Sequence, residues 1–172
     1  GDFYGVPGQP ISSPHDADER RARFIIAFRQ LADTDEATFK NILAAIAPEF
    51  EALQEAYHEK TSLEAALKKR EGKAGWSAYK RYVAASPSYA ELLLDNYDHF
   101  QADALLAHDA GYEEAIQTAI QAFAETNPQN KQNLLVDALA KELFACHFLS
   151  DYFASGHIRT PRRALYNYGL QN

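Results

Sequence analysis

The stretch that decides the fold class runs from Asn127 to Phe153 and reads NPQNKQNLLVDALAKELFACHFLSDYF. Asn127 followed by Pro128 is typical of a helix start, because asparagine caps the first turn and proline fits its opening position. Apolar side chains then recur at helical spacing: Leu135, Leu139, Phe144, Phe148 and Tyr152. The pattern predicts one long helix over about 128–153. This helix is apolar around much of its circumference and therefore central to the fold.

Helical periodicity also dominates the rest of the chain. Phe24, Ile25, Phe28 and Leu31 follow an acidic first turn, as a helix start requires. Further on, we expect one segment from near Asp98 that stops at Gly111, and another helix over roughly 112–125. No period-two alternation is long enough to predict a strand. The sequence therefore predicts an all-α class, with a single bundle of six to eight helices.

Glycine and proline mark the domain organisation. Residues 1–15 are rich in both and predict an extended N-terminal arm. Residues 16–172 are expected to form one helical domain. Within it, the basic stretch from Lys68 to Lys73 is followed by glycine, and we interpret it as a solvated turn.

Charge and cysteine content narrow the classes of function. The 172 residues carry a formal net charge of −7, which disfavours tight nonspecific binding to nucleic acid or an anionic membrane. We therefore expect no stable nucleic-acid complex. The single cysteine, Cys146, excludes an intramolecular disulfide framework and a cysteine-rich zinc knuckle.

The candidate chemistry lies near the end of the long helix. His147 and Asp151 are four positions apart, so they share a helix face about 6 Å apart at Cβ and could hold one divalent ion. His157 follows Gly156, which would let the chain turn back toward the same cavity. Imidazole and carboxylate together suit zinc.

A plainer interpretation of the same residues exists. A histidine and an aspartate at this spacing are usually a surface contact or a hydrogen-bonded core pair. Here Phe144, Phe148 and Tyr152 predict that the helix is buried. Because burying a carboxylate with an imidazole is costly without compensation, the metal interpretation gains weight.

These residues resemble a known family. His147, Asp151 and His157 stand at the spacing of the zinc-binding signature of the zinc-dependent phospholipase C and S1/P1 nuclease superfamily. The stretch 96–100, NYDHF, resembles that superfamily's His-Phe site, with His99 as another zinc-binding imidazole. The segment 156–162 and the opening 1–5 look like a bacterial branch of phospholipases C. The resemblance covers mainly residues 95–163 and implies a phospholipase C/P1 nuclease-like fold.

The resemblance also implies a site with two to three zinc ions. His99, His147 and Asp151 would hold one ion, Asp151 would bridge to a second, and His157 would belong to a further ion. The family takes other ligands from an N-terminal tryptophan and a nearby histidine, roles that Asp2 or His15 could fill here.

The third metal site departs from the family. No His, Asp or Glu follows His157, so the third site is incomplete. Three explanations stay open: the chain is a fragment that is incomplete after residue 172, a second chain completes the site, or one zinc is absent.

The implied function is zinc-dependent phosphodiester hydrolysis by metal-activated water, in which Asp151 and Asp98 are the catalytic candidates. Asp98 would orient the water, although Asp95 could replace it and Asp98 could equally be a helix N-cap. Arg159 is a candidate for binding the substrate phosphate. The alternative is that it belongs to a solvated basic turn. Tyr152 is a candidate for lining the substrate pocket, as an alternative to a core role.

A phospholipid is the preferred substrate, and we expect an extracytoplasmic or secreted protein. Two alternatives stay open: a single-strand-specific nuclease of the same superfamily, and a non-enzymatic helical effector or adaptor with a partial metal site.

Overall fold

The computed structural model describes residues 3–71 and 76–171. It confirms the all-helical class: 80% of the chain is helix, and the described residues contain no strand. Nine α-helices and one 3-10 helix occur in these two ranges, slightly more than the six to eight expected. None of the helices over the described residues is both long and apolar enough to cross a membrane.

The chain divides into two compact units. The first comprises Gly1–Ala32 with Glu91–Asn172, and the second comprises Asp33–Ala90. The second unit is thus an insertion between α1 (Ala17–Ala32) and the rest of the first unit. Each unit is described separately below.

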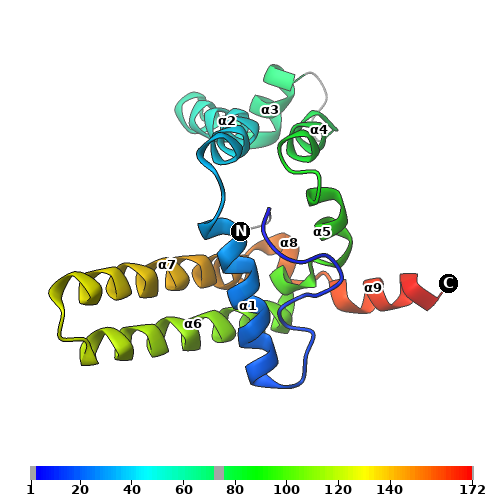
Figure 1. The fold of residues 1–172 in the computed structure, drawn as a ribbon. Coiled ribbons are helices and arrows are strands. Elements are labelled where there is room, and N and C mark those ends of the chain that lie inside the picture. The colour runs from blue at the N-terminus through cyan, green and yellow to red at the C-terminus, as the bar shows by residue number, and fades with distance from the viewer. Residues whose placement is uncertain (1–2, 72–75, 172) are drawn as a thin grey trace. The chain divides into compact units, whose positions relative to one another are not determined.

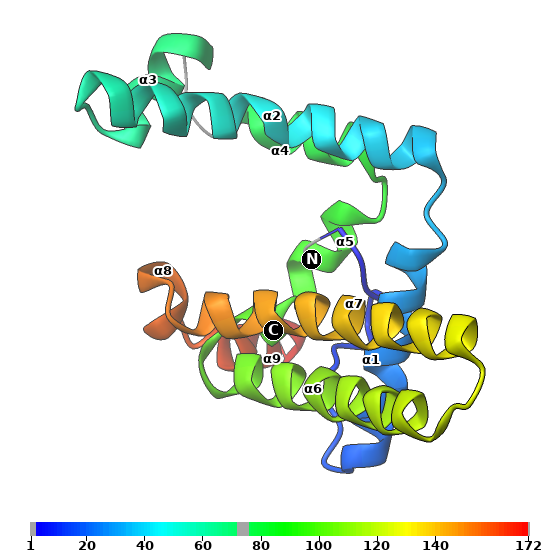
Figure 2. The ribbon, with the colours of Figure 1, turned by 90° about the vertical axis from the view of Figure 1, so that its left-hand side faces the viewer.

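The first unit is built on a long helical hairpin. Helices α6 (Gln101–Ala124) and α7 (Pro128–Tyr152) run antiparallel side by side, and α1 packs across α6 (Figures 1 and 2). Asn127 caps α7 as predicted, because its side chain accepts hydrogen bonds from the backbone of Gln129 and Asn130. The core lies where the three helices meet, and it consists of Ile11, Phe24, Ala27, Phe28, Ala107, Ala110, Phe144, Ala145 and Phe148.

The prediction that a helix stops at Gly111 is wrong, because α6 continues through this residue to Ala124. A Cβ atom at Gly111 would lie 2.3 Å from Phe24 Cε2 and 2.7 Å from the Cβ of Ala145. Glycine is therefore needed here for close packing of α6 against α1 and α7, and it does not end the helix.

Short elements complete the first unit and carry most of the candidate site. They are α5 (Tyr89–Asp95), the 3-10 helix η1 (Tyr97–His99), α8 (Ser155–Ile158) and α9 (Arg162–Gln171). Helix α5 begins at the end of the second unit and continues into the first. Element η1 contacts both α6 and α7, and His99 lies beside the last turn of α7.

The second unit consists of α2 (Glu36–Glu59), α3 (Leu63–Glu71) and α4 (Trp76–Ala85), with α3 and α4 packed on α2. Its small core contains Ala52, Ala56 and Ala66. A solvated turn was predicted for Lys68 to Lys73. This prediction is wrong for residues 68–71, which belong to α3, and residues 72 and 73 lie outside the described residues. Within this helix, Lys69 and Arg70 form ion pairs with glutamates of α2.

Candidate metal centre

His99 and Asp151 meet although 52 positions separate them in the sequence. His99 ends the buried element η1, Asp151 lies in the last turn of α7, and His99 Nδ1 is 2.7 Å from Asp151 Oδ2. His99 is 7% exposed, and the Asp151 side chain is 25% exposed. A carboxylate that accepts from an imidazole fixes the orientation of that ring and leaves its other nitrogen as the acceptor or metal-binding atom.

His147 lies one turn before Asp151 on α7 and adds a second imidazole. Its ring centroid is 5.3 Å from that of His99. The Nδ1 atom of His147 donates a hydrogen bond to the carbonyl of Phe144 in the same helix. The ring of Phe148 packs against both imidazoles, with its centroid 5.1 Å from that of His99. One side of the centre is therefore apolar.

His157 supplies a third imidazole from the short helix α8. Its Nδ1 atom is 3.7 Å from Asp151 Oδ1, and its ring meets Phe100 edge-on with the centroids 4.4 Å apart. Within the described part of the chain, this buried nitrogen has no hydrogen-bond partner. The Asp151 carboxylate thus faces His99 on one oxygen and His157 on the other.

Gly156 does not make the turn that brings His157 back, contrary to the prediction. Gly156 lies inside α8. The chain turns at Phe153 and Ala154, whose backbone N–H groups donate to the carbonyls of Ser150 and Asp151. Two residues after the helix are enough, so the glycine carries no special backbone requirement.

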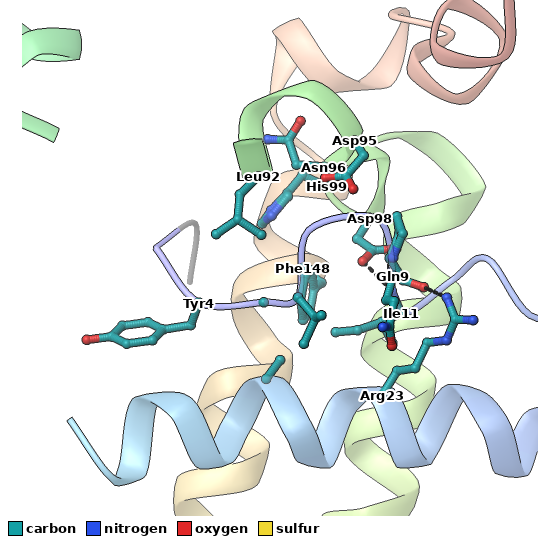
Figure 3. Close-up of a pocket in the computed structure, with 14 residues that line it drawn as sticks. Tyr4, Gln9, Ile11, Arg23, Leu92, Asp95, Asn96, Asp98, His99 and Phe148 are labelled. Atoms are coloured by element: carbon teal, nitrogen blue, oxygen red, sulfur yellow. Dashed lines mark hydrogen bonds between the residues drawn. The ribbon is translucent and has the colours of Figure 1, made fainter. Parts of the chain in front are cut away.

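Asp98 points toward the N-terminal arm (Figure 3). Its Oδ2 accepts from the backbone N–H of Ile11 at 2.6 Å, and its Oδ1 accepts from that of Ser12 at 2.8 Å. The side chain is buried, and this burial raises the pKa of the carboxyl group. The N-cap alternative is wrong, because Asn96 precedes η1 and Phe100 precedes α6.

Asp95, the other carboxylate considered beside Asp98, also binds the arm. Its Oδ2 accepts a hydrogen bond from the backbone of Gly8, which has a φ of 76°. Burial raises the pKa of this carboxyl group too. Asp95, Asp98 and His99 line the same pocket together with arm residues such as Tyr4 and Gln9 (Figure 3).

The two predicted substrate contacts lie next to Asp151 and His157. Arg159 is exposed at the C-cap of α8. Tyr152 lines a largely apolar pocket between the start of α6 and the end of α7, and the other lining residues are Gln101, Ala102, Leu105, Phe153 and Ile158. The neighbouring arginines have internal partners: Arg162 donates to the carbonyl of Leu93, and Arg163 binds Asp103 and Ser12.

The predicted ligand Asp2 lies outside the described residues. His15, the alternative at the N-terminus, is exposed at the end of the arm, and its carbonyl accepts from Arg20.

A second group of metal-ligating side chains was missed by the sequence analysis. One ligand atom from each of His108, Glu142 and Cys146 lies within 4.8 Å of the others. The spacing of Glu142 and Cys146 on one helix is visible in the sequence. His108 could be added only by knowing that α6 packs beside α7. Burial and a hydrogen bond with Glu142 raise the pKa of the Cys146 thiol, which keeps it protonated at neutral pH.

Comparisons of this chain with models of protein families, with curated proteins and with solved structures found no match.

Proposed function

We propose that this chain is a zinc-dependent phosphodiester hydrolase of the phospholipase C type, with a phospholipase C/P1 nuclease-like fold. Its centre would be formed by His99, His147, Asp151 and His157. One observation carries the proposal: the carboxylate of Asp151 is approached by His99 at 2.7 Å and by His157 at 3.7 Å, from two different segments. Burial of charged and polar groups is costly unless hydrogen bonds, ion pairs or a metal ion compensate for the lost water.

The donor set fits zinc. Imidazole nitrogen and carboxylate oxygen bind zinc at ~2.0–2.2 Å, so two ligand atoms in a tetrahedral site stand about 3.3 Å apart. The 3.7 Å between His157 Nδ1 and Asp151 Oδ1 is near this separation and too long for a hydrogen bond. The buried His157 nitrogen, which has no hydrogen-bond partner among the described residues, also supports a ligand role.

The chain's own residues would orient these ligands. Donation from His147 Nδ1 to the Phe144 carbonyl leaves the lone pair on Nε2, which is the tautomer that a metal ligand needs. Phe148 and Phe100 pack against the imidazoles and exclude water from one side. Zinc, when bound, supplies a water whose pKa is lowered toward ~7 and a positive charge next to the phosphate.

The surroundings favour a phospholipid as substrate. The apolar pocket with Tyr152 and Ile158 adjoins Asp151 and His157 in the chain, and Phe153, which is 68% exposed, lies at its edge. Such a surface suits an acyl chain, and the exposed Arg159 would bind an anionic phosphate. A nuclease would require a basic groove, whereas the net charge of this chain is −7.

The test is a comparison of Asp151→Asn with Asp137→Asn, a matched change on the same helix at a half-exposed residue paired with Lys141. Zinc would be counted by mass spectrometry. Hydrolysis of a synthetic phospholipid and of single-stranded DNA would be followed with and without chelator. We expect Asp151→Asn to lose most of its zinc and to lower lipid hydrolysis at least about 100-fold, with Asp137→Asn unchanged.

Two results would contradict the proposal. If Asp151→Asn holds as many zinc ions as the wild type, the centre is not where we place it. If the wild-type chain binds zinc there but hydrolyses neither substrate, the chain is a helical module with a metal site and no phosphodiesterase activity.

A further inference from the structure

We infer that this chain has a second, separate cation site formed by His108 of α6 with Glu142 and Cys146 of α7, which binds zinc in preference to magnesium and calcium. The ligand atoms of these three residues lie within 4.8 Å of one another. The inference uses none of the residues of the centre around Asp151, so it does not depend on the proposed hydrolase function.

The two long helices create this cluster. Glu142 and Cys146 are one turn apart on α7 and share a face, while His108 reaches them from α6. Gly111 lies one turn after His108, where the absence of a side chain lets α6 approach Ala145 of α7. The close helix contact that glycine permits therefore lies beside the cluster and holds its ligands near one another.

The hydrogen bonds of the cluster leave one acceptor unused. Cys146 Sγ lies 3.4 Å from Glu142 Oε1. The other carboxylate oxygen, Glu142 Oε2, is buried and accepts no hydrogen bond from any described residue. An acceptor of this kind is costly to bury without a partner, and a cation would provide one.

The third ligand is held in position by its own helix. The ring of His108 stacks on Tyr112 with the centroids 5.9 Å apart, and Nδ1 is 3.2 Å from Asp109 Oδ1. The His108 side chain is 15% exposed, so an ion could enter from solvent without unfolding the hairpin. Only small movements of the ligands are required. Their ligand atoms lie within 4.8 Å of one another, and in a tetrahedral zinc site such atoms stand about 3.3–3.7 Å apart.

The donor chemistry selects the ion. Thiolate, imidazole and carboxylate together are a zinc-type set, whereas magnesium and calcium prefer oxygen alone. Binding of the ion would release the proton of the Cys146 thiol to solvent, and the resulting thiolate together with the Glu142 carboxylate would neutralise the charge of the ion. Three protein ligands leave a fourth position for water.

Cobalt(II) is the probe that separates this site from the centre around Asp151. A cysteine ligand gives cobalt an intense sulfur-to-metal absorption in the near ultraviolet, which imidazole and carboxylate ligands do not give. Metal-free protein would be titrated with cobalt as wild type, Cys146→Ser, His108→Ala and Asp151→Asn. Circular dichroism would confirm that each variant keeps its helix content.

We expect the sulfur-to-cobalt absorption in the wild type and its complete loss in Cys146→Ser. His108→Ala should weaken cobalt binding, measured by this absorption, at least about tenfold, and zinc should displace the cobalt. Asp151→Asn should keep the absorption, because its carboxylate belongs to the other centre. A folded wild-type chain that shows no such absorption, or one whose absorption survives Cys146→Ser, would overturn the inference. Loss of the absorption in Asp151→Asn would overturn it as well, because the two sites would then not be separate. Loss in Asp151→Asn of only the cobalt that gives no such absorption would instead bear on the proposed hydrolase centre.

Discussion

Asp98 shows how one buried side chain can serve a different task from the one its neighbours suggest. It adjoins His99 in the chain, but its two oxygens accept hydrogen bonds from the backbone of Ile11 and Ser12. At the residue scale its role is therefore to hold the N-terminal arm against the first unit. From the sequence we expected Asp98 to orient a catalytic water, and that role stays a prediction.

Replacement of Asp98 tests the anchoring role. Asp98→Ala leaves two buried backbone donors without this acceptor, so we expect a loss of about 1–3 kcal/mol in the free energy of unfolding, measured in urea. Asp18→Ala is the control, because that carboxylate is 80% exposed and its change should stay within about 0.5 kcal/mol. Unchanged stability together with lost hydrolysis and full zinc content would instead support the catalytic role.

At the scale of the element, the contact between α6 and α7 depends on Gly111. Gly111→Ala would place a Cβ 2.3 Å from the ring of Phe24, so we expect a destabilisation of about 1–3 kcal/mol in chemical unfolding. Gly169→Ala in α9 is the matched change, since nothing lies within 4 Å of a Cβ there. That variant should be neutral or more stable, because alanine favours helix over glycine. Equal stability of the two variants would show that α6 does not pack as described.

The packing of α3 on α2 depends on charge and therefore on pH. Hydrogen bonds from Lys69 and then Arg70 lower the pKa of Glu55 below its ordinary value of 4.5. Because the folded-state pKa is the lower one, this stabilisation is present above about pH 4.5 and is lost as the pH falls through the folded-state pKa. We expect Glu55→Gln to be less stable than wild type at pH 7 and to match it in strong acid. A difference that persists in acid strong enough to protonate Glu55 in the folded state would contradict the ion-pair explanation.

Several elements could be predicted from the sequence, for reasons that are local. The start of α7 at Asn127-Pro128 and the shared face of His147 and Asp151 follow from spacing along a single helix. The course of α6 could not be predicted, because Gly111 is explained by Phe24 and Ala145, which are far away in the chain. The same limit applies to Asp98, whose partners lie in the arm.

At the scale of the whole molecule, two compact units are made from one chain, and the candidate chemistry lies entirely in the first. Four of its predicted ligands come from η1, α7 and α8, so these ligands meet only when the hairpin and the short elements assemble. The sequence could predict the ligand types and the pair on α7. It could not predict that His157 would face the second oxygen of Asp151, because that depends on the turn between α7 and α8.

The most direct test of the account is a crystal structure of the zinc-loaded protein with anomalous diffraction recorded on both sides of the zinc edge. We expect a peak of zinc anomalous density at ~2.0–2.2 Å from Asp151 and from at least two of the imidazoles of His99, His147 and His157. A zinc-loaded crystal with no peak there, in which His99 and Asp151 still share a direct hydrogen bond, would contradict it.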